Sequence, residues 1–330
     1  MHSQKHHTQP IYSAVRPTAM ASPALKTSEP NLTPIGCGSI ALRVIIHRER
    51  VSDLQPLVIL NSVDFPMPPS DAFCERMWEA GYQVIFIERP GFGSSRGLPK
   101  DLTQDRHIKS GAAVTAEAAV LYQMLDKLQL KDMVLLGMGS ANPVCYRLAR
   151  LSSDISLSIF SNAMFNQDIW GVFRPRWFQS MLRQTVGSKP GLYFATYGVK
   201  HQLRKAPMSF YRGLLQKSEG DLRYFEDNKA SFLQASRLMR NIEASTFNYD
   251  LKMSLTPDHA LRDDYFQGVN AVVMTGEETT ELWQSQLQTE ADRLGLPIVY
   301  APSGDLYAPY ASPDMLITTM DERAKKRKRA

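Results

Sequence analysis

A glycine-rich turn between an apolar run and a helical pattern is the part of this sequence best suited to chemistry. Residues 134–149 read VLLGMGSANPVCYRLA, and the turn consists of Gly137, Met138, Gly139 and Ser140. Turns of the form G-x-G-x-x-G bind the pyrophosphate of a dinucleotide, whereas turns of the form G-x-S-x-G present a nucleophilic serine above a sheet. The turn alone leaves phosphate binding, serine chemistry and a purely structural role open.

The third glycine of the phosphate-binding pattern is missing. Asn142 stands where a glycine or alanine would let the helix and the strand pack closely. The turn also follows a strand pattern well inside the chain, whereas the dinucleotide fingerprint follows the first strand. We therefore expect no nucleotide and no other cofactor. His2, His6 and His7 have no acidic or cysteine residue nearby, so we expect no metal site.

The elements around the turn indicate an α/β fold. Short, nearly continuous apolar runs are typical of strands buried on both faces of a parallel sheet. They occupy residues 56–60, 83–87, 133–137, 155–160, 270–274 and 296–300. Residues 40–46 alternate as a half-buried strand or hairpin does. Helical patterns separate these runs at 70–81, 110–130 and 281–295. The alternation predicts a doubly wound, mostly parallel sheet.

One interval breaks this alternation. Between Phe160 and Asn270 the chain is rich in aromatic residues at helical spacing and has no convincing strand. We interpret the interval as a helical cap, which in such folds often walls a ligand pocket at the carboxyl ends of the strands. The side chains expected to line that pocket are Met138, Trp170, Phe173, Trp177 and Phe178.

The chain then divides into four predicted segments. Residues 1–34 form a flexible arm, because they are rich in Ser, Thr, Pro and His without any period. The α/β core comprises 35–162 and 269–322, with the cap at 163–268 between its two parts. Residues 323–330 form a basic tail.

A second glycine-rich stretch narrows the fold further. GYQVIFIERPGFGSS at 81–95 resembles the strand and turn of capped α/β-hydrolases, in which an acidic residue is followed by x-Pro-Gly-x-Gly-x-Ser. The matching residues are Glu88, Pro90, Gly91, Gly93 and Ser95. The resemblance, to esterases, lipases and epoxide hydrolases, runs from about residue 38 to residue 320. It implies the α/β-hydrolase fold with a helical cap.

The resemblance also implies where a catalytic triad would lie, and the triad residues are absent there. Aligned without a gap, the nucleophile falls on Gly139, the acid on Thr279 and the histidine on Asp305. At the oxyanion turn, Asn61 and Ser62 replace the family's His-Gly, with Ser140 as the residue after the nucleophile position. Loss of the nucleophile or the base alone lowers the rate by a factor on the order of 10⁶. These residues argue against a hydrolase acting by the usual route.

Neighbouring residues offer altered chemistry instead. Ser140 lies one place after the nucleophile position, and we expect its side chain to cap the first turn of the helix. Glu277 and Glu278 precede the acid position and could pair with Asp305 for proton transfer. A serine in such a turn is held at positive φ, a strain of about 1–3 kcal/mol that a glycine at 139 removes. Whether the chain is an enzyme stays open at this stage.

Charge and composition limit the partners. The net charge is +5, but the last ten residues, DERAKKRKRA, hold six basic and two acidic side chains and so account for +4 of it. We therefore expect no specific nucleic-acid site, and at most weak binding of this tail to anionic surfaces. The three cysteines are far apart, which disfavours disulfides and zinc. Without a signal-like or membrane-spanning apolar run, we expect a cytoplasmic protein.

The sequence thus favours a catalytically degenerate α/β-hydrolase-fold protein that binds a small apolar or acyl ligand, or a protein partner. The alternative is an ester or acyl hydrolase of altered mechanism that uses Ser140 or the carboxylates of Glu277, Glu278 and Asp305. An open capped pocket would favour the ligand, whereas a pocket filled by bulky side chains would favour the protein partner. The oligomeric state stays open.

Overall fold

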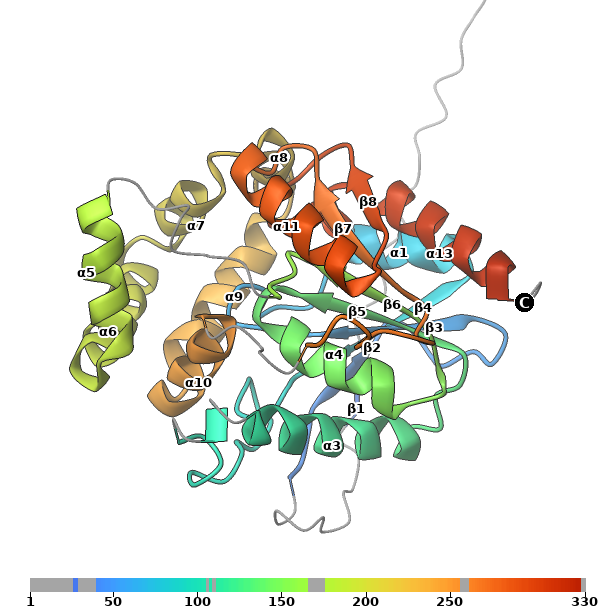
Figure 1. Cartoon of the computed structure of the whole chain (residues 1–330), viewed down its shortest axis with the longest axis horizontal. Helices are drawn as coiled ribbons and strands as arrows, with labels where there is room; N and C mark the ends of the chain where they lie inside the picture. The colour runs from blue at the N-terminus through green and yellow to red at the C-terminus, as the bar shows by residue number, and fades with distance from the viewer. Residues whose placement is uncertain are drawn as a thin grey trace, which may run out of the picture.

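The computed structural model describes residues 26–28, 40–104, 107–108, 111–165, 176–255 and 261–327. Within them, eight strands form one sheet in the order β1-β2-β4-β3-β5-β6-β7-β8 (Figure 1). The strands are β1 (Lys26–Ser28), β2 (Val44–Ile46), β3 (Gln55–Leu60), β4 (Tyr82–Ile87), β5 (Met133–Met138), β6 (Ile155–Ser161), β7 (Ala271–Gly276) and β8 (Ile298–Ala301). β2 pairs antiparallel with β1 and β4, and all other neighbours are parallel. The predicted class, a mostly parallel α/β sheet, is confirmed.

Helices cover both faces of this sheet. On one face α3 (Ala112–Lys127), α4 (Asn142–Leu151) and α11 (Glu281–Leu294) share an apolar core with strand residues such as Val58 and Leu135. On the other, α1 (Asp71–Glu79) and α13 (Pro313–Arg327) share a second core with Leu57 and Leu136. Figure 1 shows α3 with α4 on one face and α1 with α13 on the other. Because successive strand residues enter opposite cores, the central strands are apolar without alternation.

The helix ends follow from local chemistry. Ser70 caps α1, since its Oγ accepts a hydrogen bond from the amide of Phe73 at 3.3 Å. Gly295 ends α11 in the left-handed conformation at φ 66°, which a glycine adopts without steric cost. Both ends were predicted from the sequence.

The predicted cap is mostly helical between residues 176 and 255, whereas its described residues 163–165 and 261–268 form loops and turns. It contains α5 (Arg176–Gly187), α6 (Lys189–Lys205), α7 (Pro207–Leu215), α8 (Glu219–Asp227), α9 (Lys229–Asn241) and α10 (Ala244–Leu255). These helices lie together at one end of the sheet, with α5 and α6 farthest from it (Figure 1). α10 packs against the short η1 turn (Gly139–Ala141), and α8 packs against α12 (Ala308–Ala311). The cap is therefore closed on the core at both places.

Two predicted segments differ in part from the structure. Within the arm expected at 1–34, residues 26–28 form β1, because their backbone pairs with β2 at the edge of the sheet. Within the tail expected at 323–330, residues 323–327 continue α13, and basic residues at a helix carboxyl end are favoured by the helix dipole. The rest of both segments lies outside the described residues. No described helix is long and apolar enough to span a membrane.

Candidate functional site

The turn singled out in the sequence, called the elbow below, links β5 to α4 through η1. Gly139 has φ +52°, in the left-handed region expected for a residue at the nucleophile position. The sharp turn is therefore kept, and glycine occupies its strained position without the penalty that a side chain would meet.

Another residue fills the space where a nucleophilic side chain would lie. A Cβ atom placed on Gly139 would be 2.6 Å from Oδ2 of Asp64 and 3.0 Å from Cε2 of Phe65. The same Asp64 oxygen accepts a hydrogen bond of 3.3 Å from the amide of Ser140. In an α/β-hydrolase turn this amide belongs to the oxyanion hole. The carboxylate of Asp64 thus occupies both the nucleophile space and one oxyanion donor.

The turn after β3 explains how Asp64 reaches Gly139. Ser62 and Phe65 close a tight turn, in which the amide of Ser62 donates to the Phe65 carbonyl at 3.1 Å and Oγ of Ser62 accepts from the Phe65 amide at 3.1 Å. Oδ1 of Asn61 accepts a 2.7 Å hydrogen bond from the amide of Arg89, which fixes the start of the turn. Asn61 and Ser62, at the predicted oxyanion turn, therefore shape the backbone that directs Asp64 to the elbow.

A second carboxylate occupies an amide of the same turn. Oδ2 of Asp250, from α10, accepts a 2.8 Å hydrogen bond from the amide of Val63. It also accepts a hydrogen bond from Oγ of Ser140. The expectation that Ser140 caps the helix was wrong: its hydroxyl is directed to the buried carboxylate of Asp250, and no side chain caps η1 or α4.

Behind this turn lies a buried ionic cluster, the Arg89 cluster, formed by Arg89, Glu117, Tyr249 and Asp250. The Arg89 guanidinium contacts Glu117 Oε1 at 2.6 Å and Asp250 Oδ1 at 2.8 Å. The hydroxyl of Tyr249 donates to Glu117 Oε2 at 2.7 Å. Arg89 and Asp250 are both 0% exposed. Burial opposes the charge of Arg89, but the carboxylates of Asp250 and Glu117 raise its pKa, so this one cation faces two acids.

Asp64 makes a third acid close to this cation. The pKa of Asp64 is raised from 3.8 to about 6, chiefly by burial and next by the charge of Asp250, while the Ser140 amide and Arg89 lower it in part. Near neutral pH the group therefore titrates inside the protein, where its charged form is poorly solvated.

This shift predicts that the protein loses stability as the pH rises. The folded chain holds the Asp64 proton up to a pH of about 6, whereas the unfolded chain releases it near 3.8. The stabilisation is complete below 3.8 and disappears as the pH passes 6. Replacing Asp64→Asn should raise the free energy of unfolding at about pH 7.5 by about 3 kcal/mol, and by far less at about pH 4.

Urea unfolding at the two pH values measures the effect. Asp101→Asn, which alters an exposed carboxylate, is the matched control and should change neither value. An equal gain from Asp64→Asn at both pH values would show that folding does not raise the pKa of Asp64.

The residues at the acid and histidine positions of the implied triad contact each other, but they are a threonine and an aspartate. Oγ1 of Thr279 donates to Oδ1 of Asp305 at 2.7 Å. Burial raises the pKa of Asp305, although the hydrogen bond from Thr279 lowers it in part. A hydroxyl and a carboxylate cannot pass a proton from a nucleophile as an imidazole held by a carboxylate does.

The predicted pairing of the carboxylates of Glu277 and Glu278 with Asp305 is not seen in the hydrogen bonds of these side chains. Glu277 is exposed. Oε2 of Glu278 accepts from Oγ of Ser218 at 2.6 Å and from the amide of Gly220 at 2.9 Å. Glu278 thus holds the amino end of α8, which is a structural role.

By fold, the chain is similar to solved structures of several enzymes. An esterase from Exiguobacterium antarcticum is 13% identical with a TM-score of 0.56, over 86% of this chain and 96% of that one. A bromoperoxidase from Bacillus anthracis is 13% identical with a TM-score of 0.56, over 92% and 100%. The enol-lactonase from Burkholderia xenovorans LB400 is 13% identical with a TM-score of 0.56, over 87% and 97%. No family model matches the sequence, and no curated protein matches it.

These matches cover 86–92% of this chain and 96–100% of the other chains, and the matched proteins have the α/β-hydrolase fold. The chain has the α/β-hydrolase fold. At such low identity the likeness concerns the fold alone, and activity has to be argued from the site.

One residue of the cap forms three hydrogen bonds with the α/β-hydrolase core. The carboxylate of Asp221, on α8, accepts hydrogen bonds from the amides of Asp305, Leu306 and Tyr307 at 3.1, 2.8 and 3.0 Å. These three residues form the loop that would carry the family's histidine. The hydroxyl of Tyr307 in turn donates to the carbonyl of Asp64 at 3.0 Å. The cap, the histidine loop and the turn at Asp64 are therefore joined by direct contacts.

Aromatic side chains fill the space between cap and core. The ring of Tyr307 packs edge-on to Phe65 with centroids 4.6 Å apart and stacks on Tyr224 at 5.5 Å. Phe232 lies 5.0 Å from Tyr211 and 5.5 Å from Tyr307. All five rings are buried. Together they form the plug, an aromatic cluster from α7, α8, α9 and the two core loops.

Of the five side chains predicted to line a pocket, the structure describes those of Met138 and Trp177. Met138 is buried in the same apolar core as the plug. Trp177 is 68% exposed on α5, at the far end of the cap, so it does not line an enclosed pocket. Trp170, Phe173 and the side chain of Phe178 lie outside the described residues.

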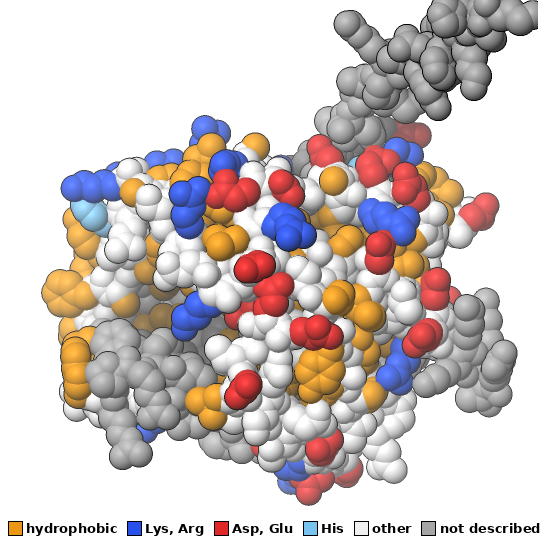
Figure 2. Space-filling model, turned by 90° about the horizontal axis from the view of Figure 1, so that it is seen from above, with side chains coloured by type: hydrophobic (Ala, Val, Ile, Leu, Met, Phe, Trp, Pro, Cys, Tyr) orange, Lys and Arg blue, Asp and Glu red, His pale blue; other side chains and the backbone are white. Residues whose placement is uncertain are grey.

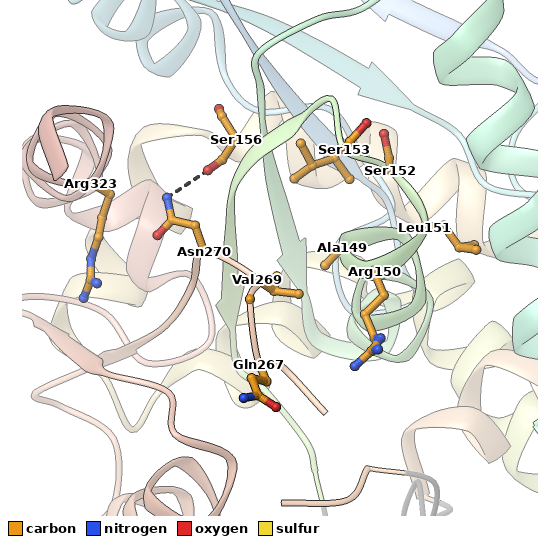
Figure 3. Close-up of a pocket in the computed structure, with 12 residues that line it drawn as sticks. Ala149, Arg150, Leu151, Ser152, Ser153, Ser156, Gln267, Val269, Asn270 and Arg323 are labelled. Atoms are coloured by element: carbon orange, nitrogen blue, oxygen red, sulfur yellow. Dashed lines mark hydrogen bonds between the residues drawn. The ribbon is translucent and has the colours of Figure 1, made fainter. Parts of the chain in front are cut away.

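An open hollow of about 740 Å³ lies at the amino ends of β6 and β7, away from the elbow (Figure 3). It lies beside the end of α4 and the residues preceding β6 and β7, including Arg150, Gln267 and Asn270. Nδ2 of Asn270 donates to the Ser156 carbonyl at 2.8 Å, as the dashed line in Figure 3 marks. Ligands of open α/β sheets bind at the carboxyl ends of the strands, so this hollow does not serve the elbow.

Sequence reasoning missed Asp64, Arg89, Glu117 and Asp250. One of them carried a signal: Glu117 falls on the apolar face of its helix between Val114 and Leu121, all three of them buried. A lone carboxylate at core spacing predicts a buried partner. Asp64 lies in a loop and Asp250 in the distant cap, where no period marks them.

Proposed function

We propose that this chain is a catalytically inactive α/β-hydrolase-fold protein that acts by binding a partner through its surface. The observation that carries the proposal is the position of Asp64, which lies where a nucleophile would be and accepts from the Ser140 amide. With Gly139, Thr279 and Asp305 at the triad positions, acyl transfer lacks its nucleophile, its base and a free oxyanion site. A cytoplasmic location stays a prediction.

The plug favours a surface partner over a small apolar or acyl ligand. Its rings pack against one another and against the turn that holds Asp64. A ligand at the elbow would have to displace buried rings and break the three hydrogen bonds of Asp221 to the loop below the cap. Binding sites for small molecules are usually formed before the ligand arrives.

The alternative, a hydrolase of altered mechanism, requires an accessible nucleophile. Ser140 does contact a carboxylate, that of Asp250, but it is buried and that carboxylate is also paired with Arg89. The carboxylate of Asp250 is held between Ser140 and Arg89, away from any substrate that could reach the surface. The geometry therefore supports a structural role for this pair.

A fluorophosphonate probe and short p-nitrophenyl esters test the proposal. We expect no labelling and no hydrolysis above the rate in buffer, because Gly139 has no hydroxyl and Ser140 is shielded. An active serine esterase run in parallel shows that probe and esters are competent. Labelling that disappears in Ser140→Ala would identify Ser140 as a nucleophile and overturn the proposal.

A further inference from the structure

The most exposed aromatic residues of the described chain gather on two cap helices. Trp177 on α5 and Tyr193, Phe194 and Tyr197 on α6 are 62–69% exposed, more than any other large hydrophobic side chain described. The rings of Tyr193 and Phe194 contact each other edge-on, and Tyr197 stacks on His201. Apolar groups gathered in this way on a surface usually mark an interaction site.

α6 is amphipathic in a way that separates this face from its packing face. Leu192, Thr196 and Leu203 are buried toward the cap, where Oγ1 of Thr196 donates to Asn248 at 2.8 Å. The outer face carries the three aromatic residues in its first half and Arg204 with Lys205 at its end. Since α6 is anchored by its inner face, the outer face is held ready for contact.

The charge of this region has one sign. Residues 176–205 contain six lysine and arginine residues and no aspartate or glutamate. Figure 2 shows basic and hydrophobic side chains at the left end of the molecule, where α5 and α6 lie, while acidic side chains spread over its middle and right. Lys200 is directed inward to the carbonyl of Ile242, whereas Arg183, Arg204 and Lys205 are exposed.

Because the charged residues at 176–205 are all basic, they favour some kinds of partner over others. In a symmetric dimer through this face, each copy would present its basic residues to those of the other, which is repulsive. Basic helices with exposed tryptophan, tyrosine and phenylalanine are suited to the interface of an anionic bilayer, where the rings enter the headgroup region and the cations contact lipid phosphates and carboxylates. No charge on residues 176–205 opposes such a surface.

We propose that the α5–α6 hairpin, residues 176–205, docks this protein on the surface of an anionic lipid bilayer. The contact is peripheral, with the outer face of α6 parallel to the membrane. The inference deepens the proposed function, in which the chain acts by binding, and assigns the partner as a lipid surface. Its test measures lipid binding without any assay of hydrolysis, so the two can fail separately.

Co-sedimentation of the full chain with vesicles tests the proposal. The vesicles are either phosphatidylcholine alone or phosphatidylcholine with about one third phosphatidylserine. We expect binding to the anionic vesicles, weakened at high salt because the Debye length shortens. The variant Tyr193→Ser, Phe194→Ser, Tyr197→Ser should bind at least tenfold more weakly. Because all three side chains are exposed, the variant should fold normally and have the same circular dichroism spectrum as the unchanged chain.

A matched control separates this face from exposed apolar surface in general. Leu214→Ser, Leu233→Ser and Leu282→Ser alter three exposed leucines outside the hairpin, and together they should leave binding within twofold. A second variant neutralises the basic residues at 325–329, because this tail is also cationic. Absence of binding to anionic vesicles, or binding lost with the tail but kept without the three aromatic residues, would overturn the proposal. In the first case an acidic protein would be the better partner.

Discussion

Replacing Arg89→Met is expected to lower the free energy of unfolding by about 3–5 kcal/mol, since the change leaves buried carboxylates without their cation. Arg89 is fully buried and contacts both Glu117 and Asp250. Methionine keeps much of the volume, so the loss reports charge rather than a cavity. Urea unfolding near neutral pH measures it.

Two further variants show where this free energy comes from. Lys131→Met breaks an exposed ion pair with Asp154 and should leave the unfolding free energy nearly unchanged. The triple change Arg89→Met, Glu117→Gln, Asp250→Asn removes the cation and both acids together, and it should be more stable than Arg89→Met alone. If Arg89→Met unfolds like the unchanged chain, the Arg89 cluster is not ionic in the folded protein.

The Arg89 cluster bears on function because it holds the elbow in its present form. Asp250 joins the guanidinium to Ser140 and to the amide of Val63, so the cap helix α10 is tied to both sides of the elbow. An α/β-hydrolase takes one oxyanion donor from the loop after β3. In this chain the Val63 amide of that loop donates to Asp250 and so helps to hold cap and core together.

The sequence predicted those elements whose pattern is contained in a few neighbouring residues. Strands between two helical layers must be apolar on both faces, so β3 to β7 could be recognised from short windows. The turn at Gly139 was recognised because its strand and helix are contiguous with it. The degenerate triad positions came from the resemblance, and the structure brings two of them, Thr279 and Asp305, into contact.

The filling of the site could not be predicted in the same way. The plug joins Phe65, Tyr224 and Tyr307, which are far apart in the chain, and their meeting depends on how the cap docks. The expected lining at 170–178 came from aromatic content alone, which does not distinguish a surface helix from a packed one. Trp177 is exposed because α5 packs chiefly on α6 and lies beyond the core.

Restoring triad residues should not restore hydrolysis. In the double variant Gly139→Ser, Asp305→His, the rate with p-nitrophenyl acetate is expected to stay within about tenfold of the unchanged chain, against the factor on the order of 10⁶ that a working triad contributes. A histidine at 305 would meet the hydroxyl of Thr279 rather than a carboxylate. The Ser140 amide would still be occupied by Asp64.

The new serine should also destabilise the fold. At φ +52° a side chain is strained by about 1–3 kcal/mol, and its Cβ would meet Asp64 Oδ2 at 2.6 Å, so crowding adds about 1–3 kcal/mol. Gly139→Ala in the same background is the matched control, because it introduces the Cβ without the hydroxyl. Both variants should lose similar stability and show the same background hydrolysis.

The comparison of the serine and alanine variants decides whether the elbow retains catalytic capacity. The serine variant could hydrolyse the ester a thousandfold faster than the alanine variant. Asp64 would then move aside readily and leave the oxyanion donors available. In that case the inactivity of the unchanged chain would result only from its missing nucleophile. If the two rates agree, the block also lies in the surroundings. Adding Asp64→Gly, which removes the carboxylate from both the nucleophile space and the Ser140 amide, should then relieve the instability of Gly139→Ser without producing esterase rates, because Thr279 still cannot orient a base.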